Sequence, residues 1–286
     1  MQLRKFLIDL YDTLFTSLVA LRYSKFSIKL PQVQTHTEVY ILGNGPSVVK
    51  VLHDESKLEI LKTKNIIVVN KFPATDYYTI LKPTTLVLID PAFFLESERE
   101  DIIPTYKAIN KSTTWKLNIV VPVMYMAQIK KIIKNENINL VPINAVGVQG
   151  FSWFKFYLIK KNIAIPSPQT VLIAAITYAL NSSYASIVLA GVEHNWLNAI
   201  GMDENNKLYI DMNVYLDQNK LNNRFYYPEG LSHSFLDEIA SQLLCMNSYK
   251  LISEYNAKCL RTPIINTTLS SYIEVFDKVD IIKILK

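Results

Sequence analysis

The sequence predicts an α/β fold with a Rossmann-like, doubly wound and mainly parallel sheet. Short runs rich in Val, Ile and Leu recur along the chain, with helix-like segments between them. Continuous apolar runs are typical of parallel strands that helices cover on both faces. Half of the 286 residues are hydrophobic and 19% are charged, which supplies a large core and argues against intrinsic disorder. The expected strands lie at 38–42, 65–70, 85–90, 117–122, 139–143 and 186–190.

Helices are expected between these strands, because open sheets wound in both directions alternate strand and helix. The stretch 195–230 interleaves Asn, Asp, Tyr and Lys with little periodicity. Long stretches of this kind are usually functional or disordered, so we expect an inserted loop or lid there. The expected helices lie at 48–61, 124–135, 168–180 and 234–255.

The first helix is expected to be amphipathic with basic ends. Acidic residues interrupt its apolar run, which argues against a spanning helix and a signal peptide. Two interpretations stay open: an anchor lying in the plane of a membrane, or a helix packed on the domain or on a partner subunit. The basic, apolar chain end KVDIIKILK repeats the pattern and favours the membrane. The apolar stripe comprises Leu3, Phe6, Leu7, Leu10, Leu14, Leu18 and Leu21, and the flanking cations are Arg4, Lys5, Arg22, Lys25 and Lys29.

The charge and cysteine content exclude several classes of protein. The net charge is +5, but the lysines are scattered, and duplex binding requires a clustered basic stripe, so no nucleic-acid partner is expected. A small polyanionic ligand or an anionic membrane surface suits this charge better. Only Cys245 and Cys259 are present, without a CxxC motif. A disulfide scaffold or structural zinc site is therefore not expected, and a reducing cytoplasm is.

The strongest local motif is GNGPS, which stands between the first expected strand and the following helix. Gly43 and Gly45 let the backbone turn sharply and approach a ligand closely. Pro46 suits the first helical position, and Ser47 with the free N–H groups of the helix start can receive phosphate or sugar hydroxyls. Asn44 offers both a donor and an acceptor. The motif lacks the third Gly of a dinucleotide fingerprint and the Lys of a P-loop.

Polar residues follow three other expected strands. Ligands bind open α/β sheets at the carboxyl ends of the strands, which here carry Asn70, Asp90, Glu193 and His194. Asp90 precedes Pro91, so it either orients a ligand group or only starts a turn. No His or Cys pair has metal-ligand spacing, and no metal residue is assigned. Mg²⁺ held loosely on a phosphate is allowed but not required.

One histidine and two tyrosines have the chemistry of catalytic groups. His233 precedes the helix expected at 234–255 and can act as a general base on an acceptor hydroxyl. Tyr209 and Tyr226 fall in the expected lid, where a phenol can stabilise charge on a departing phosphate. The alternative for each is a structural role.

The order of these motifs resembles the bacterial sialyltransferases of glycosyltransferase family forty-two and related transferases of CMP-activated nonulosonic acids. The resemblance covers roughly residues 38–260. It rests on ILGNGPS, VVNKF at 68–72, LIDPAFF at 88–94, SPQTVLIAAITYAL with SIVLAGVEH at 167–194, and HSFLDEIA at 233–240.

The resemblance implies a single-domain, GT-A-like fold and an inverting transferase that uses a CMP-sugar donor. By position in the motifs, Asn44 would contact the nucleotide and Asn70 would lie near the phosphate or ribose. His233 would deprotonate the acceptor, and Tyr209 or Tyr226 would stabilise the departing phosphate. The implied organisation is an N-terminal helix at 1–32, a nucleotide-binding domain at 33–194, a lid at 195–232 and a C-terminal helical part at 233–286.

The sequence departs from the family at three places. Ala92 replaces an Asn of the third-strand motif, and no Arg stands in the segment with Ser167, Gln169 and Thr170, which can hydrogen-bond a ligand instead. The family's strand-end tyrosine falls in the segment that contains His194. Sialic, pseudaminic or legionaminic acid and Kdo all remain candidate donor sugars.

The implied acceptor is a surface glycan or a lipid-linked oligosaccharide, used on the inner face of a bacterial cytoplasmic membrane. No tightly bound cofactor is expected, and a homo-oligomer is left open. Two other functions remain: an ATP-dependent pterin diphosphokinase, which resembles the chain around the GNGPS element, and a non-catalytic nucleotide-binding protein of a glycan operon.

Overall fold

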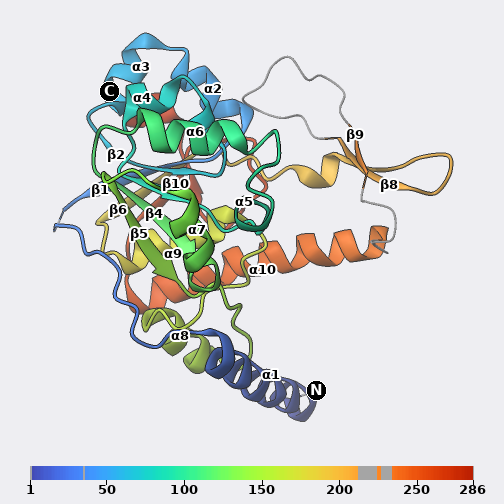
Figure 1. Cartoon of the computed structure of the whole chain (residues 1–286). Helices are drawn as coiled ribbons and strands as arrows, with labels where there is room; N and C mark the ends of the chain where they lie inside the picture. The colour runs from blue at the N-terminus through green and yellow to red at the C-terminus, as the bar shows by residue number, and fades with distance from the viewer. Residues whose placement is uncertain (1, 35, 212–223, 227–233, 286) are drawn as a thin grey trace.

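A computed structural model describes residues 2–34, 36–211, 224–226 and 234–285 (Figure 1). The described residues build an eight-stranded sheet in the order β11-β10-β6-β1-β2-β3-β4-β5, and every pairing in it is parallel. This confirms the predicted fold class. The strands are β1 (Glu38–Leu42), β2 (Asn65–Val69), β3 (Thr85–Val87), β4 (Leu117–Pro122), β5 (Ile138–Ile143), β6 (Ser186–Ala190), β10 (Ile264–Asn266) and β11 (Asp277–Lys278).

The strand order reverses between β1 and β6. From β1 the chain adds β2 to β5 outward on one side, and then returns to place β6 on the other side of β1. Strand β1 pairs with both neighbours: Val39 lies beside Ile187 in β6 and beside Asn65 in β2. Such a reversal leaves a crevice at the carboxyl ends of the two central strands, which is the usual ligand position in open α/β sheets.

The core lies on both faces of this sheet, because alternate strand residues point to opposite sides. Val39 and Ile41 of β1 belong to one apolar cluster, and Tyr40 and Leu42 belong to the other. The first face is covered by α8 (Ser152–Lys160), α9 (Val171–Asn181), α10 (Phe235–Cys259) and the end of α1 (Gln2–Tyr23). The second face is covered by α2 (Pro46–Leu52), α3 (Glu55–Leu61), α4 (Tyr77–Leu81), α5 (Ala92–Leu95), α6 (Ile103–Ser112), α7 (Met126–Ile132) and α11 (Ile281–Ile284).

The helix expected at 48–61 is two helices. Residues His53 and Asp54 separate α2 from α3, and the Asp54 side chain accepts a hydrogen bond from the N–H of Lys57. Asp is a preferred N-cap residue, because its carboxylate pairs with an N–H group that the first turn leaves unsatisfied. Apolar spacing continues across the break, so the periodicity alone did not reveal it.

The polar stretch after β6 is not simply a loop. Its described residues form the short helix η3 (Trp196–Asn198) and an antiparallel sheet of β7 (Ile200–Met202), β8 (Leu208–Asp211) and β9 (Arg224–Tyr226). Figure 1 shows β8 and β9 projecting from the main body. These strands have three or four residues each, so they are too short to show an apolar alternation. Cross-strand pairing defines them.

The C-terminal segment, which was expected to be helical, also contributes two strands to the sheet. Strands β10 and β11 extend the sheet beyond β6. The apolar side chains of the chain end enter the core: Leu285 is buried, and Ile281 and Ile284 pack against the second cluster. Three apolar residues of KVDIIKILK thus pack against the protein itself, whereas Ile282 is 57% exposed.

Helix α1 lies at the periphery of the molecule (Figure 1). Of its side chains only Thr16 and Ala20 are buried. Among the described residues, no helix combines the length and the apolar character that are needed to cross a bilayer.

Candidate functional site

The loops that follow β1 and β6 lie directly against each other at the point where the strand order reverses. Gly43 N–H donates to Ala190 O at 2.8 Å, and Gly45 N–H donates to Gly191 O at 2.9 Å. A Cβ atom on Gly43 would stand 2.2 Å from the Gly191 carbonyl oxygen. The sequence analysis assigned these glycines to the close approach of a ligand. In the structure they permit the close approach of the neighbouring loop.

Glu193 occupies the space over the GNGPS turn. Its Oε1 accepts the N–H of Ser47 at 2.6 Å, and the residue is only 5% exposed. A Cβ on Gly45 would lie 1.5 Å from Glu193 Oε2, so only glycine leaves room for the carboxylate. Pro46 is the first residue of α2, as predicted. The Ser47 N–H, which the sequence analysis offered to a phosphate, already donates to this carboxylate.

Residues after β10 hold the Glu193 loop in place, and the sequence analysis missed them. Thr268 Oγ1 accepts the N–H of Val192 at 3.1 Å and lies 3.3 Å from Ser47 Oγ. Ser271 donates its hydroxyl to Val192 O at 2.6 Å. The sequence did contain one indication of them: the apolar strand β10 ends in Asn266, and an apolar strand that ends in Asn is the pattern that singled out Asn70.

Polar side-chain atoms without a partner gather at this edge of the sheet. The neighbouring strands β10, β6, β1 and β2 end there. Leaving a buried polar atom unpaired costs about 1–3 kcal/mol, so a group of such atoms at one edge indicates where a polar ligand could bind. The atoms that are buried without a hydrogen-bond partner in the described structure include Asn44 Oδ1, Asn70 Oδ1, Glu193 Oε2, His194 Nδ1 and Asn266 Nδ2.

His194 belongs to a buried chain of hydrogen bonds. Its Nε2 lies 2.9 Å from the hydroxyl of Tyr249, which in turn lies 3.2 Å from Thr170 Oγ1. Burial lowers the pKa of His194 from 6.5 to about 4 and raises that of Tyr249 well above its usual value. The imidazole is therefore neutral at pH 7. The structure thus joins His194 and Thr170, and Tyr249 of α10, which the sequence analysis missed, is the link.

The backbone at this edge takes up left-handed conformations. Asn70 has φ +49°, His194 has φ +50° and Gly191 has φ +69°. Non-glycine residues pay a conformational cost in this region, although Asn tolerates it better than most. Such residues concentrate at functional sites, where the surrounding structure holds them. The conformation turns the chain sharply as it leaves β2 and β6.

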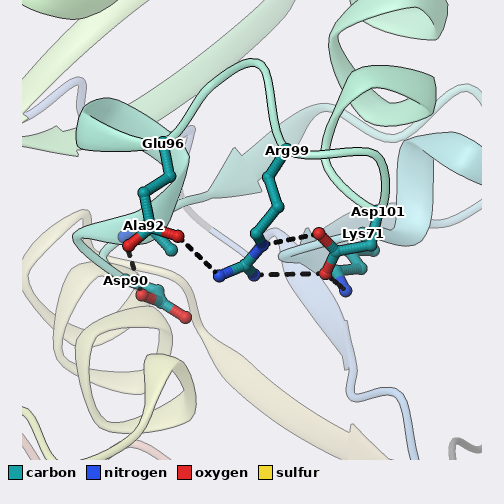
Figure 2. A network of polar contacts seen from close by, with 6 residues as sticks. All are labelled: Lys71, Asp90, Ala92, Glu96, Arg99 and Asp101. Atoms are coloured by element: carbon teal, nitrogen blue, oxygen red, sulfur yellow. Dashed lines mark hydrogen bonds and ion pairs between the residues drawn. The ribbon is translucent and has the colours of Figure 1, made fainter. Parts of the chain in front are cut away.

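Asp90, which follows β3, makes a local turn contact. It is exposed, and its Oδ1 accepts the N–H of Ala92 at 2.9 Å, which is the turn-forming alternative of the sequence analysis. Figure 2 shows it beside a separate network centred on Arg99. Arg99 donates to Asp101 at 2.6 Å and to Glu96 at 3.0 Å, and Lys71 pairs with the same Asp101.

The cations of this network already have anionic partners. Hydrogen bonds from Arg99, and secondly from Lys71, lower the pKa of Asp101 to about 2, so it is ionised at neutral pH. Lys71 and Arg99 therefore do not replace the arginine that the family motif carries elsewhere.

The segment before α9 is only partly connected to the central edge. Gln169 is exposed, and its amide bridges Ser167 Oγ at 3.3 Å and Ser241 Oγ of α10 at 3.0 Å. Thr170 is buried and contacts Tyr249. Of the three residues assigned here, Thr170 is linked to the Glu193–His194 loop by hydrogen bonds through Tyr249.

The structure describes only some of the residues that were assigned to catalysis. Tyr209 lies in β8, where its backbone pairs with Tyr226 of β9 and its ring covers Gly201. The side chain of Tyr226 and the whole of His233 lie outside the described residues. The chain leading to β7 is tied to the site, because the Trp196 ring packs at a tilt with its centroid 4.9 Å from that of the His194 ring, and Tyr272 donates to Asn198 at 3.0 Å.

The electrostatic character of the site is acceptor-rich. Its unpaired atoms include three oxygens, from Asn44, Asn70 and Glu193. A ligand that donates hydrogen bonds, as sugar hydroxyls and amino groups do, would satisfy them. Within the described parts of the chain, no group of three His, Cys, Asp or Glu residues stands close enough to hold a metal ion.

Comparison with known proteins adds one structural likeness. No family model and no curated protein matches the chain. A solved structure of the MAf glycosyltransferase from Magnetospirillum magneticum AMB-1 superposes with a TM-score of 0.50 at 12% sequence identity. The match covers 90% of this chain and 35% of that protein, so this chain spans about a third of its length. The likeness establishes a shared fold.

Proposed function

We propose that this protein is an inverting glycosyltransferase. In this proposal it moves a CMP-activated nonulosonic acid, or a related keto-sugar acid, to a hydroxyl of a cell-surface glycan. The observation that carries the proposal is the set of unpaired polar atoms of Asn44, Asn70, Glu193 and Asn266 at the reversal of strand order. A polar ligand of nucleotide-sugar type supplies the missing partners, and the position is the usual one for it.

The class of reaction comes from two likenesses that agree. The ordered motifs resemble CMP-sugar transferases, and the protein with the superposable fold is described as a glycosyltransferase. Neither likeness identifies the donor. The donor is therefore proposed as a class, with sialic, pseudaminic and legionaminic acid and Kdo as its members.

Glu193 favours one orientation of the nucleotide. A carboxylate over the GNGPS turn repels a phosphate but accepts hydrogen bonds from the hydroxyls of a ribose. We therefore place the ribose near Glu193 and Asn44, with Asn70 toward the phosphate. Tyr209 and Tyr226 of the lid are the proposed groups that stabilise the phosphate.

The chemistry assigned to the remaining residues is a single displacement. His233 accepts the proton of the acceptor hydroxyl, whose oxygen forms a bond to the anomeric carbon from the face opposite CMP. The bond from that carbon to the phosphate oxygen breaks, and CMP leaves with the electron pair. General-base assistance is worth about 10²–10⁴-fold in rate. Mg²⁺ is not required by this scheme, because phenol groups stabilise the leaving phosphate.

Nucleotide binding is the first test. Thermal unfolding of the full chain is followed with CMP, CDP, UDP, GDP, and ATP with Mg²⁺. A ligand at 100 times its Kd stabilises the folded state by roughly 2.7 kcal/mol. We expect CMP to raise Tm selectively. Stabilisation by ATP and not by CMP would overturn the proposal and favour the diphosphokinase.

A matched pair of variants locates the binding site. Asn70→Gly removes the amide while glycine accepts the left-handed backbone, and Asn206→Gly is the control, because Asn206 has φ +57° and is exposed. We expect the CMP-induced shift to fall for Asn70→Gly only. Equal shifts in both variants would place the nucleotide elsewhere.

Catalysis is tested separately with His233→Ala. The variant should bind CMP as the parent does but transfer sugar at least 100-fold more slowly. Transfer at the parental rate would remove His233 from the mechanism.

Nucleotide binding without turnover of any CMP-sugar by the parent chain would indicate a non-catalytic binding protein. An acceptor linked to lipid would place the reaction in the bacterial cytoplasm, at the inner face of the membrane.

A further inference from the structure

Helix α1 turns its apolar stripe away from the protein. The seven residues of the stripe are all exposed, and Ile8, Tyr11 and Phe15 widen it to one side. Leu14 is 58% exposed and Leu18 is 68% exposed. In a helix that packs on its own domain, the apolar stripe is the face that is buried. Here the stripe is left for something outside the chain.

The face that docks on the domain is polar and small. The Oγ1 atoms of Thr13 and Thr16 accept the N–H groups of Phe151 and Gln149, each at 3.1 Å. A Cβ on Gly150 would lie 2.1 Å from Thr13 Oγ1, so the two backbones are in close contact. Ala20, one turn after Thr16, enters the first core cluster. The hydrogen bonds fix the rotation of the helix and so keep the stripe outward.

The charges of this region are also sorted. Among the described residues from Gln2 to Leu30, the exposed charged residues are all basic: Arg4, Lys5, Arg22, Lys25 and Lys29. The two acids of the segment, Asp9 and Asp12, lie at half-buried positions on the docked side. On the helix itself, Arg4 and Arg22 lie beside the apolar stripe, on a face that carries no acidic residue.

Helix α8 lies beside α1 and also exposes large side chains (Figure 1). Figure 1 shows α8 beside α1, and the rings of Phe6 and Phe151 stand 5.5 Å apart. Trp153 is 68% exposed, and Tyr157 and Lys160 are exposed on the same helix. Amphipathic aromatic rings and lysines are the residues that concentrate at the boundary between lipid headgroups and acyl chains.

We propose that the outward face of α1, together with Trp153 and Tyr157 of α8, binds the surface of an anionic lipid bilayer with α1 in the membrane plane. Apolar residues would enter the boundary layer while the cations contact lipid phosphates. A second copy of the chain fits less well, because two such faces would bring cations together without acids to pair with them. This inference rests on the proposed function only in one respect: that function determines on which side of the membrane the protein would bind.

Vesicle flotation of the full-length protein tests the proposal. Vesicles of phosphatidylcholine with 30 mol% phosphatidylglycerol, taken as a probe of roughly physiological anionic charge, are compared with pure phosphatidylcholine. We expect binding to the anionic vesicles, weakened by salt. Arg4→Gln with Lys5→Gln should lower the partition coefficient roughly fivefold for each cation removed.

A matched pair of double variants separates the face from general hydrophobicity. Leu14→Gln with Leu18→Gln changes the stripe, and Leu95→Gln with Met124→Gln changes residues of 64% and 62% exposure elsewhere. Only the first pair should abolish flotation. No flotation by the parent, or equal loss in both pairs, would overturn the proposal. Oligomers that the first pair dissociates, seen by light scattering without lipid binding, would assign the face to a second copy.

The same variants distinguish this inference from the proposed chemistry. Stabilisation by CMP should be unchanged in the α1 variants, because none of the changed residues contacts the edge where Glu193 lies. If the protein binds lipid but no nucleotide stabilises it, the membrane proposal holds and the transferase proposal is contradicted. If CMP stabilises the protein but it does not bind lipid, the transferase proposal holds and the membrane proposal is contradicted.

Discussion

At the scale of single residues, the candidate site depends on groups that are held in costly states. His194 combines a left-handed backbone with a buried neutral imidazole, and Glu193 is a buried carboxylate with one unpaired oxygen. These states persist because the loops after β1, β6 and β10 hydrogen-bond to one another. Part of the stability of the fold therefore offsets the cost of presenting polar atoms to a ligand.

His194 makes stability depend on pH. Its pKa of about 4 in the folded chain lies below 6.5, so the unfolded chain binds more protons between these values. The stability that the neutral imidazole of His194 contributes is therefore complete above pH 6.5 and is lost as the pH falls toward 4. Because one pKa unit corresponds to roughly 1.4 kcal/mol, the loss in the free energy of unfolding amounts to a few kcal/mol. Urea unfolding from pH 4.5 to 7.5 measures it. His194→Gln should show a flatter profile, and an unchanged slope would contradict this prediction.

Gly191 is a glycine whose replacement should be costly in the folded state. Its φ of +69° is strained for any other residue, and a Cβ would lie 2.8 Å from Val48 Cβ and 2.9 Å from Gly43 O. We expect Gly191→Ala to lower the free energy of unfolding by roughly 2–4 kcal/mol. Urea denaturation measures the change. A loss below about 0.5 kcal/mol would show that the two loops separate easily.

At the scale of elements, similar sequence patterns have opposite fates at the two ends of the chain. Both ends combine apolar and basic residues, but Leu285, which directly follows α11, is buried in the core, whereas α1 leaves its stripe exposed. The difference follows from the docking face. Helix α1 is fixed by hydrogen bonds of threonines, and α11 is fixed by apolar contacts.

A pair of substitutions in the last helix tests this distinction. Leu285→Ala removes a buried side chain and should lower the free energy of unfolding by roughly 2 kcal/mol, whereas Ile282→Ala, at an exposed position, should change it by about 0.5 kcal/mol or less. Chemical denaturation measures both. Equal effects would mean that the chain end is not packed as described.

At the scale of the whole molecule, one sheet organises both apolar clusters and the ligand edge. Helix α1 contributes only Thr16 and Ala20 to the buried residues, so it adds little to this organisation. The region that is proposed to bind lipid and the region that is proposed to bind nucleotide are thus separate parts of one fold. Each can be changed without the other.

Removal of residues 2–23 tests that separation. We expect the shortened chain to unfold cooperatively, with a Tm within a few degrees of the parent, and to keep its stabilisation by CMP. Vesicle flotation should be lost. Differential scanning calorimetry with and without CMP checks the first two points. A chain that no longer unfolds cooperatively would assign α1 a larger part in the fold.

The sequence by itself determined the parallel sheet, the GNGPS turn and the polar strand ends. These follow from local rules, because β-branched runs favour strands, glycine permits close contacts and a proline suits a helix start. Asn70 and Glu193 were found in this way. The apolar stripe of α1 was found too, but its direction was not, since periodicity defines a face without saying what covers it.

Only the tertiary structure decided which of these residues meet. Glu193 lies 146 residues from Ser47 in sequence and yet accepts its N–H, and Tyr249 joins His194 to Thr170 across two helices and a loop. Such contacts depend on strand order, and no local pattern encodes that β6 returns beside β1. The short strand β10 is stabilised by β6, a partner distant in the chain. The fold also determined that Asp90 forms a turn with Ala92.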